Sequence, residues 1–246
     1  MTERTGRLFV MLLFAALLFA CSSKFSADNV FPAGPARSIA HLAETNALPE
    51  NVPSSLRNGL NVVGRYELTP LLWAVTDDRV KPETVAILVR SGADPFYYSK
   101  TQLTSPVLHS LNYGPLEEFT AIVSNVRDID QHQGWYTAEP TLLFSAVANR
   151  DVAKVQAVVK AGAKLEARND LGQTPLLYAM TGQLDVMLYL IRAGANVHAR
   201  DVHGHDVCED ALGDLHFDTP ERRQELNRVL LELRTRGVTC KRTSTR

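Results

Sequence analysis

The stretch Thr174-Pro-Leu-Leu-Tyr-Ala-Met180 decides the fold, because the chain contains it four times in related form. The other copies, in chain order, are Thr69-Pro-Leu-Leu-Trp-Ala-Val75, Ser105-Pro-Val-Leu-His-Ser-Leu111 and Thr141-Leu-Leu-Phe-Ser-Ala-Val147. Successive copies begin 36, 36 and 33 residues apart. Internal similarity at such a period indicates a repeat protein, in which each repeat is one supersecondary unit that stacks on its neighbours.

A second element follows three of the four copies and ends in a Gly-Ala pair. The pairs stand in Ser91-Gly-Ala-Asp94, Ala161-Gly-Ala-Lys164 and Ala193-Gly-Ala-Asn196. Apolar residues at helical spacing precede each pair, as at Val152, Val155 and Val158. The pattern predicts two helices per repeat. Thr caps the first helix and Pro opens it, while the Gly supplies the positive φ that ends the second.

Together the two elements resemble the ankyrin repeat. The resemblance is strongest over residues 141–206, where Ala167-Arg-Asn-Asp-Leu-Gly-Gln-Thr-Pro175 matches the turn of that family into the next repeat. It implies an all-α solenoid of helix pairs with short projecting β-hairpins or loops. We expect about six units including caps, because no single repeat can bury its own apolar face.

Two repeats depart from the pattern, and two segments read as caps. The Thr69 repeat has extra residues around Val80, Lys81 and Pro82, and the Ser105 repeat has Val126-Arg-Asp-Ile-Asp130 in place of Gly-Ala. The expected caps are residues 36–60, with a helix stop at Asn58-Gly59, and residues 206–239, whose last helix has a basic outer face. The predicted repeat domain spans residues 37–240, and residues 241–246 are a predicted disordered tail. Within the first-helix motif, Trp73, Phe144 and Tyr178 are predicted to pack in the core or between repeats.

The front of the chain is typical of an exported protein. Arg4 and Arg7 precede 13 apolar residues, 8–20, a length that suits a signal-peptide core and is too short to span a bilayer. Leu18-Phe19-Ala20-Cys21 resembles the bacterial lipobox, which implies cleavage after residue 20 and a diacylglycerol on Cys21. The alternative is that Cys21 is only the tail of a signal peptide or anchor. Residues 21–36 are polar with Pro and Gly and predict a lipidated Cys followed by a flexible tether.

Resemblance to bacterial lipoproteins also implies a compartment. Ser22 after the Cys, in place of Asp, favours the outer membrane, with the repeat domain facing the periplasm. In that oxidising compartment Cys208 and Cys240 are predicted to form one disulfide, against the alternative of two buried free thiols. Two thiols without matching ligands make a poor zinc site.

Composition and motifs exclude several functions. The chain of 246 residues has a net charge of −1, 45% hydrophobic and 22% charged residues, so it offers no strong field for nucleic acid. It contains no Gly-x-Ser-x-Gly, His-Glu-x-x-His, Cys-x-x-Cys or phosphate-binding Gly-rich motif, and we predict neither an enzyme nor a cofactor. A cluster on the last hairpin has the residue types of a metal site, but a solvated turn or a partner contact is favoured. Its members are His198, Asp201, His203, His205 and Asp206.

The remaining candidates are for protein binding. In the ankyrin arrangement, residues near hairpin glycines and just after the first-helix motif point into one groove, and aromatic residues there are typical interface anchors. The predicted contact residues are Tyr97, Tyr98, Asn112, Tyr113, Trp135, Tyr136, Asp170, Gln173, His203 and His205. The alternative for the loop aromatics is that they pack under their own loop.

The predicted partner is a folded protein, and its class rests on resemblance alone. Envelope-anchored ankyrin lipoproteins resemble immunity proteins that neutralise phospholipase effectors of type VI secretion. An immunity protein of that kind waits in the periplasm and covers the active site of the toxin. The alternative is an envelope scaffold or stress-defence protein that binds a resident periplasmic protein.

Overall fold

The computed structural model describes residues 26–131, 140–179, 183–208 and 219–240. The chain divides into two compact units, residues 1–106 and 107–246, which are described separately. Residues 1–25 and 241–246 lie outside the described residues, and with them the predicted leader, Cys21 and the predicted tail. No helix in the described part of the chain is long and apolar enough to cross a membrane.

Unit 1 begins earlier than the sequence analysis predicts. Its elements are α2 (Ala27–Val30), α3 (Pro35–Glu44), α4 (Ser54–Arg57), the 3₁₀ turn η1 (Arg65–Glu67), α5 (Pro70–Ala74) and α6 (Pro82–Arg90). The prediction of a flexible tether through residue 36 is wrong for residues 27–36. Ala27, Val30 and Phe31 are at most 1% exposed, because α2 packs its apolar side onto α3. The cap helix α4 ends just before Asn58, at the predicted stop.

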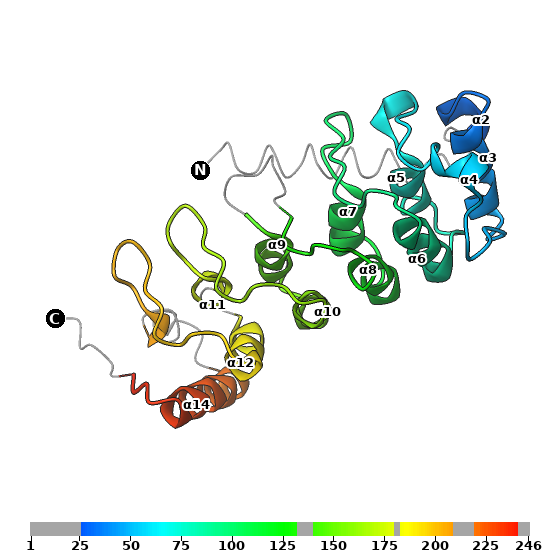
Figure 1. Cartoon of the computed structure of the whole chain (residues 1–246). Coiled ribbons are helices and arrows are strands. Elements are labelled where there is room, and N and C mark those ends of the chain that lie inside the picture. Colours follow the sequence, from blue (N-terminus) through cyan, green and yellow to red (C-terminus); the bar gives the residue numbers. More distant parts are fainter. Residues whose placement is uncertain (1–25, 132–139, 180–182, 209–218, 241–246) are drawn as a thin grey trace, which may run out of the picture. The chain divides into compact units, whose positions relative to one another are not determined.

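The remaining described helices belong to unit 2, and six of them form three first-and-second-helix pairs. They are α7 (Pro106–Asn112), which starts at the boundary of the units, α8 (Leu116–Val123), α9 (Leu142–Asn149), α10 (Val152–Lys160), α11 (Pro175–Tyr178), α12 (Leu184–Ala193) and α14 (Pro220–Thr235). The second helices α8, α10, α12 and α14 pack in sequence order, and α9 packs on α11 (Figure 1). The predicted ankyrin arrangement of helix pairs is confirmed.

The motif residues act as predicted where the Thr-Pro pair is intact. Thr69 and Thr174 accept a hydrogen bond from the backbone N–H of Leu72 and Leu177, at 3.1 and 3.4 Å. Thr141 precedes Leu instead of Pro, and its buried hydroxyl has no hydrogen-bond partner. The capping function therefore belongs to the Thr-Pro pair in its full form, and not to the Thr alone.

The second helices end on glycine where the sequence places Gly-Ala. The φ angles of Gly92, Gly162 and Gly194 are 107°, 95° and 105°, in the region that favours glycine. Helix α8 is followed instead by Ser124 and Asn125, neither of which has a positive φ. The Ser105 repeat is therefore irregular in structure as well as in sequence.

A recurring hydrogen bond joins a turn to the following repeat at three places among the described residues. The side chain of Asn61 accepts from the backbone N–H of Asp94 at 2.8 Å in unit 1. In unit 2, Asp130 accepts from Lys164 at 3.1 Å and Glu166 accepts from Asn196 at 2.7 Å. The three donors all follow a Gly-Ala pair, so one polar contact is repeated with the period of the fold.

Two of the three predicted core residues are buried, and Tyr178 is half-buried. Trp73 and Phe144 are 2% and 0% exposed, and the ring of Tyr178 meets that of Phe144 edge-on with centroids 5.3 Å apart. Because Phe144 lies in α9 and Tyr178 in α11, this contact joins neighbouring first helices. The prediction of packing in the core or between repeats is confirmed.

The C-terminal cap consists mainly of α14. Val229 and Leu233 are its buried residues and face α12, while Arg223, Arg228 and Arg234 are exposed as predicted. A disulfide joins Cys208 to Cys240, with Cα atoms 5.1 Å apart. The bond closes a loop that contains the whole of α14, and it ties the end of the domain to the start of the cap.

Candidate protein-binding surface

The hairpin of residues 168–173 is built by its own polar side chains. The Asn169 carboxamide accepts from the backbone N–H of Leu171 and of Gln173, at 3.0 and 2.9 Å, and donates to the Gln173 side chain at 3.0 Å. Gly172 has a φ of 69°, and its carbonyl accepts from the Arg168 guanidinium. The predicted contact Gln173 is therefore partly engaged in holding the turn, whereas Asp170 is exposed at the tip.

The next hairpin, residues 200–206, repeats this design with an Asp in place of the Asn. The Asp201 carboxylate accepts from the backbone N–H groups of His203 and His205, at 2.8 and 2.9 Å. Burial works to raise the pKa of Asp201, but these two N–H donors and the nearby imidazoles outweigh it and hold the pKa below its usual value. Arg200 donates to the carbonyl of Gly204 and to the Asp206 carboxylate, each at 2.6 Å.

The two hairpins are joined and form a double hairpin, residues 168–173 with 200–206 (Figure 1). The backbone N–H of Val202 donates to the carbonyl of Leu171 at 3.0 Å, and Arg168 donates to the carbonyl of Arg200 at 2.8 Å. A Cβ on Gly172 would come within 3.0 Å of the Val202 side chain, so the glycine permits this approach. Both loops are therefore ordered before any partner arrives.

The apolar tips of the double hairpin are absent from the sequence-based candidates. Leu171 and Val202 are 50% and 65% exposed, although they lie next to each other. Exposed apolar residues on a rigid support are typical of an interface. A usable signal exists in the sequence, since each stands between turn-forming residues, in Asp170-Leu-Gly172 and Asp201-Val-His203, where a polar residue is usual.

The two histidines of the double hairpin, His203 and His205, bind Asp201 within the turn. The Nδ1 atom of His205 lies 3.3 Å from the Asp201 carboxylate, and the rings of His203 and His205 are 5.8 Å apart. Both side chains are exposed and so are available to a partner. His198 lies before the hairpin, where its backbone N–H donates to Asn196. Among the described residues, no three His, Cys, Asp or Glu side chains come together as a metal site would require.

The turn between α7 and α8 carries two further predicted contacts. Asn112 accepts a hydrogen bond from Asn149 at 3.2 Å, and Tyr113 is 59% exposed with its ring 5.3 Å from that of His109. Burial lowers the pKa of His109 to about 4, so this imidazole is neutral at pH 7. The turn therefore offers an exposed, uncharged aromatic residue.

A buried lysine from the next repeat supports this turn. Lys154 of α10 is 6% exposed, and its Nζ atom donates to the carbonyls of Ser110, Leu111 and Gly114 at 3.2, 2.6 and 2.9 Å. These carbonyls lie at or just after the end of α7, and that of Ser110 also accepts from the backbone N–H of Gly114 at 3.0 Å. The ammonium group thus ties α10 to the end of the first helix of the Ser105 repeat, and it lies 5.8 Å from the Phe119 ring centroid.

Glu118 of α8 lies beside the lysine in the same interior. It is 7% exposed, and one of its oxygens lacks a hydrogen-bond partner. A Cβ on Gly114 would collide with this carboxyl group, so any other residue there would have to displace the Glu118 side chain. Burial raises the pKa of the Glu118 carboxyl, against the opposing effects of the Ser110 hydroxyl and the Lys154 charge. Sequence patterns did not single out Glu118 or Lys154.

In unit 1 the corresponding surface is the loop of residues 95–104. The backbone N–H of Thr101 donates to Glu67 at 2.8 Å and holds the pKa of that carboxylate below its ordinary value. The Gln102 side chain donates to the carbonyl of Tyr66 at 3.1 Å. Tyr66 and Glu67 have φ angles of 61° and 55°, a conformation that costs non-glycine residues free energy and that these contacts help to maintain.

Two of the predicted aromatic contact residues, Tyr97 and Tyr98, lie in this loop. Tyr97 and Tyr98 are half-buried in the 95–104 loop, and burial together with the nearby Glu67 charge raises the pKa of Tyr97. Their partial burial fits the alternative that they pack under their own loop. The more exposed side chains here are Tyr66 and Leu103, at 51% and 57%.

Trp135 and Tyr136 lie outside the described residues. Asp170 and Gln173 come together with His203 and His205 on the double hairpin, whereas Asn112 and Tyr113 lie on the α7–α8 turn, and Tyr97 and Tyr98 belong to unit 1. A single groove that gathers all ten predicted contacts stays a prediction.

Comparison with known proteins agrees with this architecture. A family model described as ankyrin repeats (3 copies) matches residues 108–201. The structure of EF0377, an ankyrin repeat protein, superposes with a TM-score of 0.53 and 18% identity, over 83% of this chain and 98% of that one.

An ankyrin repeat domain from Acinetobacter baumannii AYE superposes with a TM-score of 0.56 and 19% identity, over 79% of this chain and 97% of that one. Ankyrin repeats are typically non-enzymatic scaffolds for protein–protein interaction. The helix pairs, the hairpins and these matches together show that the chain has the ankyrin-repeat fold.

Proposed function

We propose that this protein binds a folded protein partner through its hairpins and α7–α8 turn, as a lipid-anchored module that faces the periplasm. The main observation behind the proposal is the double hairpin, because its two hydrogen-bonded loops present Leu171 and Val202 next to each other at the surface. A preformed apolar contact of this kind binds without the entropic cost of ordering a flexible loop. The exposed His203, His205 and Asp170 supply a polar rim.

The specific role that we propose is immunity against a phospholipase effector of type VI secretion. The support for this role comes from the sequence, which combines a lipobox-like Cys21 with ankyrin repeats. A toxin that attacks membrane lipids from the periplasm has to be met there by a protein that covers its active site. Lipid anchoring would hold the inhibitor in that compartment, since each buried methylene of an acyl chain contributes about 0.8 kcal/mol to membrane binding.

Binding is tested by charging the apolar tips. The double variant Leu171→Asp and Val202→Asp should weaken partner binding by about 2 kcal/mol or more, roughly 30-fold, because each substitution removes an apolar contact and desolvates a charge. Leu231→Asp is the matched control, since Leu231 is 63% exposed on α14, away from the hairpins. Equal binding by the hairpin variant and the control would show that the partner lies elsewhere.

The immunity role is tested with the products of the genes next to this one. We expect one of them to hydrolyse phospholipids and to lyse cells when it is exported alone to the periplasm. Co-expression of the present protein should restore growth and inhibit hydrolysis with the purified proteins, whereas the hairpin double variant should do neither. If no neighbouring product is a phospholipase and the partner is a resident periplasmic protein, the scaffold role is correct instead.

Two measurements address the compartment. Cys21→Ala should leave an uncleaved or mislocalised precursor, and its continued sedimentation with the outer membrane would contradict lipidation at Cys21. Mass spectrometry of protein from cells should show Cys208 and Cys240 joined. Two free thiols in periplasmic material would contradict the pairing of Cys208 with Cys240.

A further inference from the structure

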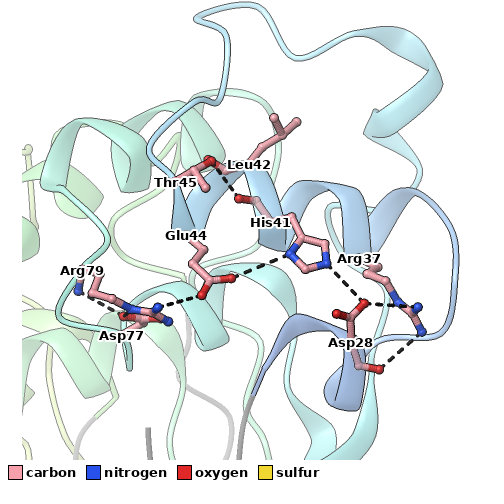
Figure 2. A network of polar contacts seen from close by, with 8 residues as sticks. All are labelled: Asp28, Arg37, His41, Leu42, Glu44, Thr45, Asp77 and Arg79. Atoms are coloured by element: carbon pink, nitrogen blue, oxygen red, sulfur yellow. Dashed lines mark hydrogen bonds and ion pairs between the residues drawn. The ribbon is translucent and has the colours of Figure 1, made fainter. Parts of the chain in front are cut away.

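The N-terminal cap carries a chain of charged side chains that joins three segments of unit 1 (Figure 2). Asp28 of α2 contacts Arg37 of α3 at 3.3 Å, and the Nε2 atom of His41 lies 3.2 Å from the same carboxylate. The Nδ1 atom of His41 lies 3.7 Å from Glu44, one turn further along α3. His41 therefore stands between two carboxylates, with one at each ring nitrogen.

The far end of the chain is fixed to the loop between α5 and α6. Arg79 contacts Glu44 at 2.7 Å and Asp77 at 2.6 Å. The Asn46 side chain donates to the carbonyl of Arg79 at 2.8 Å and so holds this loop against the end of α3. Glu44 consequently has a fixed position, whereas Asp28 lies on the four-residue helix α2, which has little structure of its own.

The network lacks one positive charge. It contains three carboxylates (Asp28, Glu44 and Asp77) and two guanidinium groups (Arg37 and Arg79). A neutral imidazole has a single N–H and can donate to only one of the two carboxylates beside it, whereas a protonated imidazole donates to both. Protonation of His41 would therefore satisfy both contacts and make the network neutral.

Other charged groups nearby are engaged elsewhere or are solvated. Helix α5 has none, and Arg57 of α4 donates to the carbonyl of Val52 at 3.1 Å. Glu67 of η1 is bound to the backbone of Thr101, Arg65 of η1 is exposed, and Asp78 of the α5–α6 loop is exposed. The charge balance around His41 is therefore set mainly by the five partners of Figure 2.

We propose that protonation of His41 closes a clasp that holds α2 against α3. The clasp acts on the first described element of the fold, at the point where the N-terminal segment enters the domain. Arg37 already binds the carbonyls of Phe31 and Asp28, and the protonated imidazole adds a second cation on Asp28. As the pH rises and the proton leaves, α2 loses one of its two cationic contacts, and the segment before α3 opens more often. The inference requires neither a protein partner nor lipidation at Cys21.

The test is hydrogen exchange of the amides in residues 27–31, measured on the chain from residue 22 onward. The described core begins at Ala27, so this chain contains all of it. The probe amide is that of Phe31, which donates to the carbonyl of Ala27 at 2.9 Å. Its protection factor should be about threefold higher at about pH 5.5 than at about pH 7.5, the scale expected for exposed ion pairs.

Matched variants separate the clasp from general pH effects. In His41→Gln the side chain still forms hydrogen bonds but takes up no proton, so the rise should disappear, and Asp28→Asn should reduce it. His203→Gln, at an exposed histidine of unit 2, should leave it unchanged. The amide of Ser91 at the end of α6 serves as internal reference for global unfolding. A protection factor of Phe31 that is independent of pH, or an equal rise in His41→Gln, would overturn the proposal.

Discussion

In the double hairpin, short polar side chains bind the backbone of their own loop, whereas a side chain from the following repeat holds the α7–α8 turn. Asn169 and Asp201 each accept two backbone N–H groups within four residues. Lys154 reaches back 40 to 44 residues along the chain to bind three carbonyls. The fold of each hairpin loop is thus set mainly by its own side chains, whereas the α7–α8 turn depends on a side chain of the next repeat.

This difference predicts where single substitutions do most damage. A lost hairpin contact leaves groups that water can reach, because the hairpins are at the surface. A lost Lys154 contact leaves carbonyls and the Glu118 carboxyl without their cation in the interior, where unsatisfied polar groups cost most. The irregular repeat should therefore be the most sensitive point of unit 2.

The largest effect is expected from Lys154→Met. The thioether fills much of the volume but donates no hydrogen bond, so three carbonyls at the α7–α8 turn lose the ammonium as a donor, and Glu118 loses a nearby positive charge. We expect the free energy of unfolding to fall by about 3 to 5 kcal/mol, as is typical when one member of a buried charged contact is removed. Urea unfolding followed by circular dichroism measures it.

Lys160→Met on the same helix is the matched control. Lys160 is exposed at the end of α10, and its loss should change stability by no more than about 0.5 kcal/mol. Similar losses in the two variants would mean that the Lys154 contacts contribute little and that the α7–α8 turn is held by packing alone.

A smaller effect, which depends on pH, is expected from Glu118→Gln. Because the folded state raises the pKa of this carboxyl above its ordinary 4.5, it binds the proton more tightly than the unfolded state does. The contribution of Glu118 to stability is therefore complete below pH 4.5 and is lost as the pH rises through the folded-state value. The free energy of unfolding of Glu118→Gln should therefore increase relative to that of the unsubstituted protein as the pH rises from 4.5 to 7. A constant difference across that range would show that Glu118 ionises as readily in the folded protein as in the unfolded chain.

Sequence patterns predicted the parts of this structure that are determined locally. The Thr-Pro pairs at residues 69 and 174 and the glycines at 92, 162 and 194 each act within one turn, so their residue type is informative by itself. Lys154 follows an ordinary helix start, Asp151-Val-Ala153, and nothing in that spacing shows that it is buried. Its role depends on the space left by Ser110 and Gly114 in another repeat.

The same reasoning explains the other differences between prediction and structure. Residues 27–36 have the composition of a tether, yet Ala27, Val30 and Phe31 are buried against an apolar surface of α3. No local sequence pattern predicts that contact. Leu171 and Val202 were missed because an apolar residue in a turn is usually buried by some other part of the chain. Here the tight approach of the two hairpins leaves both of them outside.

The smallest expected effect comes from comparing one substitution at two equivalent positions. Thr174 accepts from the backbone N–H of Leu177, so Thr174→Val removes a helix cap and should cost about 1 kcal/mol. Thr141 makes no cap and buries an unpaired hydroxyl, so Thr141→Val keeps the shape, removes a desolvated polar group and should be neutral or slightly stabilising. Urea unfolding of both variants at one pH gives the difference directly. Equal losses would show that Thr141 acquires a capping bond in solution, and that the repeat without Pro is closed in the same way as the regular ones.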